Sequence, residues 1–189
     1  MDIPNVALQL AELHWKEIGK EEPSALLGFD FIRAFYLEIL TSKYAEVFYS
    51  TGKSGSIISL CCVFRDHNRF SRSLKFRMIP IVLRNLLAKK ISLKVVIKSI
   101  LTSTDLSKVP STQYHLGMIV RCSASIPSST FFLSKNVERA IEYLRDSDAK
   151  SAWASARISN VESVKFLEAH QFDEISRTDE TISFVRFLV

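Results

Sequence analysis

Glycine and proline are scarce in this chain of 189 residues, which contains five of each. A ligand therefore finds few backbone positions that it can approach unhindered. Long hydrophobic runs are also missing, and the longest falls far short of the roughly 20 residues that a membrane-spanning helix needs. Charged residues interrupt the N-terminal region, so we expect no signal peptide there.

Cysteine is equally rare. The three cysteines, Cys61, Cys62 and Cys122, have no metal-ligand spacing, and their odd number argues against a disulfide framework. Cys61 and Cys62 lie in an apolar run, so we expect them to be small buried side chains. Together these features predict a protein without a bound metal in the reducing environment of the cytoplasm.

Carboxylates are almost absent from one long segment. Residues 65–98 contain five Arg, five Lys and a single carboxylate, Asp66, which makes a formal charge of +9 and leaves −4 on the rest of a chain whose net charge is +5. Such a localised basic block predicts an anionic partner. We expect a phosphorylated substrate or an anionic membrane surface. Nucleic acid is disfavoured, because the segment also has a long apolar face and no evident helix-turn-helix turn.

Hydrophobic residues make up 47% of the chain, which suits a globular protein, and no linker or repeat divides it. We therefore expect one domain over residues 1–189. Periodicity and turn residues predict alternating helices and strands in its second half, after two helices and a hairpin. The predicted helices cover residues 5–18, 24–42, 67–90, 92–104, 128–147 and 160–171, and the predicted strands lie within 45–64 (a hairpin turning at 51–55), 112–124, 150–159, 172–177 and 180–189.

The basic segment is predicted to form two helices with their basic residues opposite a single apolar face, and Pro80 is expected to kink or divide the first. The apolar face of that first helix is predicted to comprise Phe70, Leu74, Met78, Val82, Leu83, Leu86 and Leu87.

A motif near the C-terminus begins at Asn160, continues through Phe166-Leu167 and ends at Gln171-Phe172. Asn160 is a good N-cap for the helix that follows. In order and spacing, this motif resembles one of the GCN5-related N-acetyltransferase (GNAT) superfamily, in which an Asn is followed by an aromatic-Tyr pair and then by Gly-Phe.

The N-terminal helices carry a second resemblance. Leu27, Gly28, Phe31, Ile32 and Tyr36 match a pattern of one bacterial branch of that superfamily, which also has a His in the first helix, here His14. In such enzymes these helices line the acceptor site, so the resemblance implies that His14, Phe31 and Tyr36 bind substrate. The branch also carries a basic helical insertion, as residues 67–104 do here.

The resemblance implies an α/β fold with a mixed, mostly antiparallel, twisted sheet and helices on both faces. It also implies transfer of an acetyl group from acetyl-CoA to a primary amine of a small molecule, with an amino sugar of surface-polysaccharide biosynthesis as the candidate acceptor and a homodimer as the candidate assembly. The resemblance further implies that the strands near residues 118 and 155 are neighbours that separate to admit the thioester. Tyr114 and His115 are the implied catalytic residues for proton transfer. The implied coenzyme-binding residues are Met118, Ile119, Val120, Ser125, Ser128, Ser129, Thr130 and Asn160.

Three positions depart from the superfamily pattern. The loop 125–130 lacks the glycines that let backbone amides approach a pyrophosphate, Leu167 replaces a Tyr that commonly protonates the departing thiolate, and Gln171 replaces a Gly. Two alternatives therefore stay open: a catalytically degenerate binding or regulatory protein of the same fold, and a nucleic-acid binder built on the basic helices.

Overall fold

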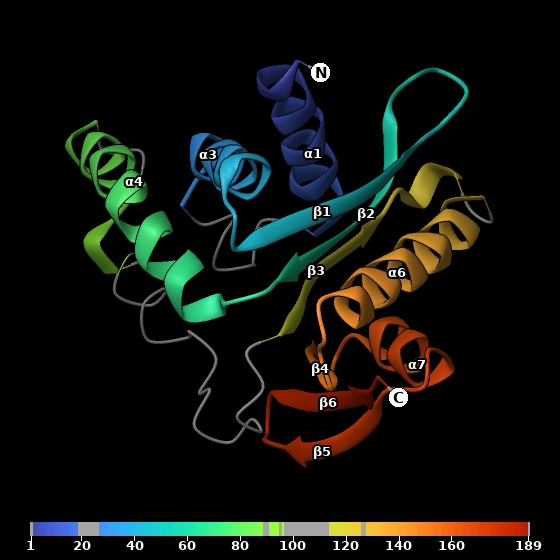
Figure 1. The fold of residues 1–189 in the computed structure, drawn as a ribbon. Coiled ribbons are helices and arrows are strands. Elements are labelled where there is room, and N and C mark those ends of the chain that lie inside the picture. Colours follow the sequence, from blue (N-terminus) through green and yellow to red (C-terminus); the bar gives the residue numbers. More distant parts are fainter. Residues whose placement is uncertain are drawn as a thin grey trace.

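The computed structural model describes residues 2–18, 27–88, 91–94, 96, 114–125 and 128–188. Most of the predicted helix 92–104 lies outside these residues. The described elements follow the predicted order (Figure 1). They are α1 (Ile3–Ile18), α3 (Phe29–Thr41), β1 (Ala45–Thr51), β2 (Ile57–Phe64), α4 (His67–Leu87), β3 (His115–Arg121), the 3-10 turn η2 (Ser123–Ser125), α6 (Ser128–Asp146), β4 (Ser151–Arg157), α7 (Val161–Ala169), β5 (Asp173–Arg177) and β6 (Thr181–Phe187).

The strands form a six-stranded sheet in the order β1-β2-β3-β4-β6-β5. Every neighbouring pair is antiparallel except β3 and β4, which run parallel. The parallel pair arises because the chain returns through α6, a crossover that brings it back to the same end of the sheet. The predicted α/β class and the mixed, mostly antiparallel sheet are confirmed.

Helices cover both faces of the sheet. In Figure 1, α1 and α3 lie on one face, α6 and α7 lie on the other, and α4 lies outside α3 at the flank of the molecule. Two hydrophobic cores result, one beneath α1 and α3 and one beneath α6 and α7. All of β2 is buried, because both of its faces are covered. Cys61 and Cys62 are buried there, as expected.

Local sequence signals account for the turns. The predicted hairpin joins β1 to β2 through a turn in which the Gly52 amide donates to the Ser56 carbonyl at 2.9 Å. Gly55 has φ of +80°, a conformation that favours glycine. The predicted closing hairpin is likewise present as β5 and β6.

The caps of α7 explain how this helix ends without glycine. The Asn160 side chain accepts a hydrogen bond from the Ser163 amide at 3.0 Å, as an N-cap does. At the other end Gln171 has φ of +61°, and the Phe172 amide donates to the Leu167 carbonyl at 3.1 Å. This is a Schellman motif in which Gln171 occupies the left-handed position usual for glycine. Phe172 and Leu167 are both buried in the second core.

Helix α4 continues through Pro80, so the proline does not divide it. The helix is capped by Asp66, whose side chain accepts from the Arg69 amide at 2.9 Å. Its predicted single apolar face is wrong: Met78 is buried, whereas Leu83 and Leu87 point into solvent. The helix packs on α3 along one side only, so apolar residues remain on the other. Within the described residues, no helix combines the length and hydropathy needed to cross a bilayer.

Candidate active site

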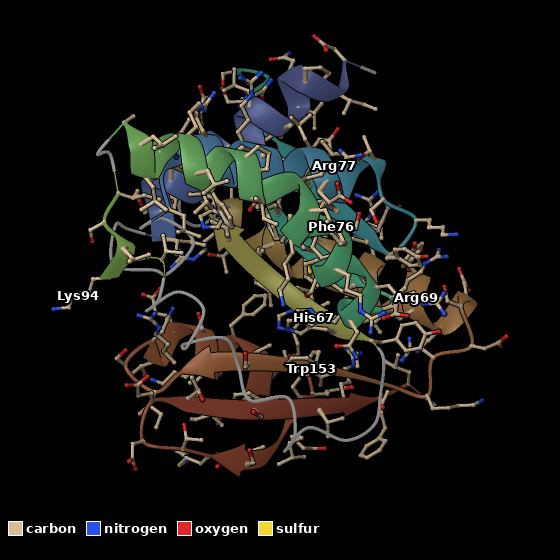
Figure 2. The ribbon with its side chains drawn as sticks, turned by 90° about the vertical axis from the view of Figure 1, so that its left-hand side faces the viewer. His67, Arg69, Phe76, Arg77, Lys94 and Trp153 are labelled. Carbon is tan, nitrogen blue, oxygen red and sulfur yellow. The ribbon has the colours of Figure 1, made fainter. Side chains whose placement is uncertain are left out.

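The parallel strands β3 and β4 separate shortly after they meet. His115 pairs with Trp153, and the register between these strands contains no further pair among the described residues. One backbone hydrogen bond, from the Trp153 amide to the Tyr114 carbonyl at 3.2 Å, lies beside this pair. Figure 2 shows β3 running away from β4 beyond His67 and Trp153. The separation expected near residues 118 and 155 is therefore confirmed, and it leaves strand edges able to bind an extended ligand.

A bulge in β3 lies where the separation begins. Val63 of β2 pairs with Leu116, but Cys61 pairs with Ile119, so β3 holds one extra residue at Gly117–Met118. A Cβ atom at position 117 would overlap the ring of Phe64, which means that only glycine fits here. A bulge of this kind bends its strand and changes the direction of its backbone groups.

Four rings close the narrow end of the opening; we call them the His–Trp cluster, comprising Phe64, His67, His115 and Trp153. The His115 ring stacks on Trp153 with centroids 3.7 Å apart and on Phe64 with centroids 5.5 Å apart. His67, the first residue of α4, meets His115 edge-on, with their Nδ1 atoms 3.4 Å apart. The cluster thus joins β2, β3, β4 and α4 at one point.

Both histidines of the cluster are neutral at pH 7. Burial lowers the pKa of His115 well below 6.5, and the neighbouring His67 lowers it further. Burial also lowers the pKa of His67, although the Asp66 carboxylate opposes this shift. Each neutral ring carries one N–H, so a hydrogen bond between the two Nδ1 atoms requires that one ring carry its hydrogen on Nδ1 and the other on Nε2. A neutral imidazole in this position can take up a proton.

Tyr114 lies on the opposite side of the sheet from His115, because adjacent strand residues alternate in direction. Its ring packs in the second core, and its hydroxyl donates to the Ser147 carbonyl at 3.1 Å. The structure therefore places the two predicted proton-transfer residues on different faces, with only His115 in the His–Trp cluster.

The loop between β3 and α6 occupies the predicted phosphate site. Ser125 ends the 3-10 turn η2, and Ser128 begins α6 with no carboxylate in its first turn. Ser129 is fully buried, and its hydroxyl donates to the Cys122 carbonyl at 2.8 Å, so this hydroxyl proton is already engaged. Ser128 is exposed and Thr130 half-buried. The amides of the first helical turn are the donors that remain for an anion.

At the wide end of the opening between β3 and β4, an ion pair joins the end of β3 to the start of α7. Arg121, at the end of β3, donates to Glu162, in the first turn of α7, at 2.7 Å. The second terminal nitrogen of Arg121, Nη1, is buried and has no hydrogen-bond partner among the described residues. Asn160, a predicted coenzyme contact, lies next to this end and uses its side-chain oxygen to cap α7.

Two of the three predicted substrate-binding residues lie in the first core. His14 and Tyr36 are fully buried, and the His14 Nδ1 atom is 3.0 Å from the Tyr36 hydroxyl. Burial lowers the pKa of His14 to about 4 and raises that of Tyr36. The pair links α1 to α3, and an acceptor would reach it only if these helices separated. Phe31, on α3, is half-buried.

His67, Trp153 and Gly117 were not predicted as site residues. A single glycine inside an apolar strand is a recognised sign of a bulge, so Gly117 had a usable signal. His67 and Trp153 had none, because each reaches the cluster from a different element. No group of three or more His, Cys, Asp or Glu side chains in the described part of the chain is arranged to hold a metal ion.

The sequence matches no protein-family model and no curated protein. The fold, by contrast, resembles solved structures of acetyltransferases. An acetyltransferase of the GNAT family from Staphylococcus aureus superposes with a TM-score of 0.60 at 11% identity, covering 98% of this chain and 94% of that one.

Two further structures carry substrate names. An aminoglycoside 6'-acetyltransferase type Ii gives a TM-score of 0.62 at 8% identity, covering 100% of this chain and 93% of that chain. A spermidine/spermine N-acetyltransferase from Vibrio cholerae gives 0.54 at 9% identity, covering 98% of this chain and 90% of that chain. Along almost its whole length, this chain has the fold of the GCN5-related N-acetyltransferases.

Proposed function

We propose that the protein is an N-acetyltransferase that moves an acetyl group from acetyl-CoA to a primary amine of a small molecule. The observation that carries the proposal is the separation of β3 from β4 after the single pair His115–Trp153, with the Gly117–Met118 bulge where it begins. The fold shared with acetyltransferases supports it.

The opening fits an extended thioester-bearing chain. Backbone groups of Met118, in the bulge, and of Ile119 and Val120, just past it, are the ones that would hold the thioester end by main-chain hydrogen bonds. At the wide end, the first turn of α6 and the guanidinium of Arg121, which is partly exposed beside Glu162, are the groups that would meet phosphate oxygens. The coenzyme supplies the acetyl group as a reactive thioester, and the residues around it supply binding and orientation.

Proton transfer is assigned to His115. An amine must lose a proton to attack a thioester, and an imidazole that is neutral at pH 7 has a nitrogen lone pair that can accept it, although the lowered pKa of His115 makes it a weaker base than a free imidazole. His115 is held neutral by its burial, and His67 contacts it through Nδ1. We assign His67 the role of a positioning residue, since its ring meets the His115 ring edge-on and the two Nδ1 atoms are 3.4 Å apart.

An amino sugar is the acceptor class that we favour. This assignment rests on the N-terminal pattern Leu27, Gly28, Phe31, Ile32 and Tyr36, which resembles a bacterial branch whose members often accompany genes of polysaccharide and glycolipid biosynthesis. We place the reaction in the cytoplasm, in keeping with three cysteines that form no disulfide.

Two observations favour a second candidate, a binding protein that uses the fold without catalysis. Leu167 is buried and has no proton to donate at the position where the superfamily has a Tyr, and the Ser129 hydroxyl is already engaged. Such a protein would bind acetyl-CoA and release no thiol with any amine.

Two measurements separate these functions. Calorimetric titration with acetyl-CoA is expected to give a Kd in the micromolar range, and a thiol-release assay over a panel of amino sugars, polyamines and aminoglycosides is expected to show turnover. His115→Gln should lower kcat at least about 100-fold with little change in the Kd for acetyl-CoA. Tyr114→Phe, on the opposite face of the sheet, is the matched control. Binding without thiol release supports the second candidate, and absence of binding at millimolar ligand contradicts both.

A further inference from the structure

Helix α4 presents a row of large apolar side chains to solvent. Phe76 is 78% exposed, Ile79 and Leu83 are each 53% exposed, and Leu87 is 85% exposed. Their spacing of three, four and four residues places them on one side of the helix. We call these four residues the α4 stripe. Figure 2 shows α4 as the outermost element of its side of the molecule, with Phe76 labelled midway along it.

The stripe is additional to the face that holds α4 in place. On the opposite side of the helix, Phe70 and Met78 are buried, and the Asn85 side chain donates to the Leu27 carbonyl at 3.3 Å. Large exposed apolar side chains occur singly on most proteins, but an aligned row is typical of an interaction surface. A helix that already has a buried face does not need a second one for folding.

The sequence of α4 itself contains cationic residues and no carboxylates. Residues 67–87 contain four Arg and one Lys and no Asp or Glu. Three of these cations pair with carboxylates of neighbouring segments. Arg72, one helical turn before Phe76, and Lys75, directly before it, are exposed and form no ion pair with any described residue. Their charge is therefore available to a partner.

We propose that the α4 stripe docks the protein on an anionic lipid bilayer, with α4 lying in the plane of the interface. Apolar side chains on one side of a helix enter the boundary between headgroups and acyl chains, while flanking Arg and Lys side chains reach the anionic headgroups. Charge argues against a second copy of this chain as the occupant. A symmetric pairing along the stripe would bring each Arg72 and Lys75 near cations of the other copy.

The position of α4 connects this surface to the candidate active site. The helix begins at His67, in the His–Trp cluster, and Phe76 lies nine residues further along, or about 14 Å at the usual rise per residue. Docking would therefore hold the narrow end of the opening, where the His–Trp cluster lies, close to the bilayer. Only this consequence rests on the proposed acetyltransferase function; the docking itself does not require it.

Vesicle co-sedimentation of the full chain tests the proposal. We expect binding to vesicles of phosphatidylcholine with one third phosphatidylglycerol, weak binding to phosphatidylcholine alone, and a loss of binding as salt rises. Phe76→Ser should weaken binding about tenfold or more, and Arg72→Gln with Lys75→Gln about fivefold for each charge removed. Phe187→Ser is the control, since this side chain is 65% exposed and lies on β6, away from α4.

Circular dichroism and thermal unfolding of each variant establish that it is folded, and analytical ultracentrifugation reports its assembly state. Equal binding to neutral and anionic vesicles, or unchanged binding by Phe76→Ser, would overturn the proposal. A third outcome would also overturn it: the unaltered protein binds no vesicles and forms a dimer, and Phe76→Ser dissociates that dimer. The stripe would then join two copies of the chain. Vesicle binding is measured without acetyl-CoA, so its failure and a failure of the acetyltransferase assay are distinguishable.

Discussion

His115 stacks on Trp153 with ring centroids 3.7 Å apart and ring planes inclined by 8°, and these residues also form the register pair that joins β3 to β4. The stack therefore lies at the apex of the opening between the two strands. It marks the place where the strands stop pairing, and it covers one face of the imidazole. The same contact thus sets both the shape of the candidate site and the protonation state of His115.

Replacing Trp153 by Leu should raise the pKa of His115 towards 6.5. The smaller side chain admits water to one face of the imidazole, and the loss of burial, the main cause of the lowered pKa, makes the charged form less costly. An NMR titration of the His115 ring protons measures the change. Tyr114→Phe should leave this pKa as it is, because Tyr114 lies on the other side of the sheet. An unchanged pKa in Trp153→Leu would contradict the assigned cause.

Acid should destabilise the fold below about pH 6.5, in part through His14. The folded protein holds the pKa of His14 at about 4, whereas the unfolded chain takes up a proton near 6.5. Unfolding is therefore favoured as pH falls through 6.5, and the loss from this residue reaches about 3 kcal/mol near pH 4. His67 and His115, whose pKa values are also lowered, act in the same direction.

Urea unfolding at a series of pH values checks this. In His14→Gln the free energy of unfolding should fall less steeply with acid. Tyr36→Phe, which removes only the hydroxyl partner of His14, should cost about 1 kcal/mol at every pH and keep the slope. An identical slope in His14→Gln and the unaltered protein would show that His14 is not responsible.

Gly117→Ala should destabilise the protein by about 1–3 kcal/mol, because the new methyl group overlaps the Phe64 ring inside a packed core. Adding Phe64→Leu should recover part of this loss, because a smaller side chain leaves room for the methyl group. Thermal unfolding of the two single variants and the double variant gives the coupling free energy between the positions. Strictly additive effects would mean that Phe64 is not what excludes a side chain at position 117.

Gln171→Gly should stabilise the protein by roughly 1 kcal/mol. Gln171 has φ of +61° at the end of α7, a conformation that strains a residue with a Cβ and does not strain glycine. Gln171→Ala keeps the strain, so it should leave the stability nearly unchanged and serves as the control. Calorimetry measures the melting temperatures of both variants. Equal melting temperatures for Gln171→Gly and Gln171→Ala would count against backbone strain at this position.

Glu162→Gln should increase the affinity for acetyl-CoA several-fold, and Arg121→Gln should reduce it. Glu162 is 82% exposed, so its ion pair with Arg121 adds little to stability and competes with a phosphate for the guanidinium. Calorimetric titration measures both effects. Glu174→Gln, which removes an exposed carboxylate paired with Arg177 on β5, is the matched control. Equal affinities for the Glu162 and Glu174 variants would place Arg121 outside the binding site.

Elements that depend on neighbouring residues were predictable from sequence. The Asn160 cap and the β1–β2 turn obey rules that operate within a few residues, and both are present. The single apolar face of α4 was predicted wrongly, because periodicity shows that a residue is apolar and does not show which side of the helix the protein covers. Leu83 and Leu87 fit the predicted pattern as well as Met78 does, yet they are exposed.

The chemistry of the candidate site depended on distant contacts. The sequence indicated His115 but not its partners, since His67 is 48 residues away in the chain and Trp153 comes from another strand. His14 and Tyr36 looked like substrate contacts, and packing of α1 on α3 buried them both.

The amino-acid sequence by itself determined the order of helices and strands, their caps and turns, and the basic character of residues 65–98, because each depends on local hydrogen bonding, periodicity or composition. Only the tertiary structure decided where β3 leaves β4, which rings close that opening, and which side of α4 faces solvent. These features depend on packing between segments far apart in the chain, so they are set only when all the helices and strands have come together.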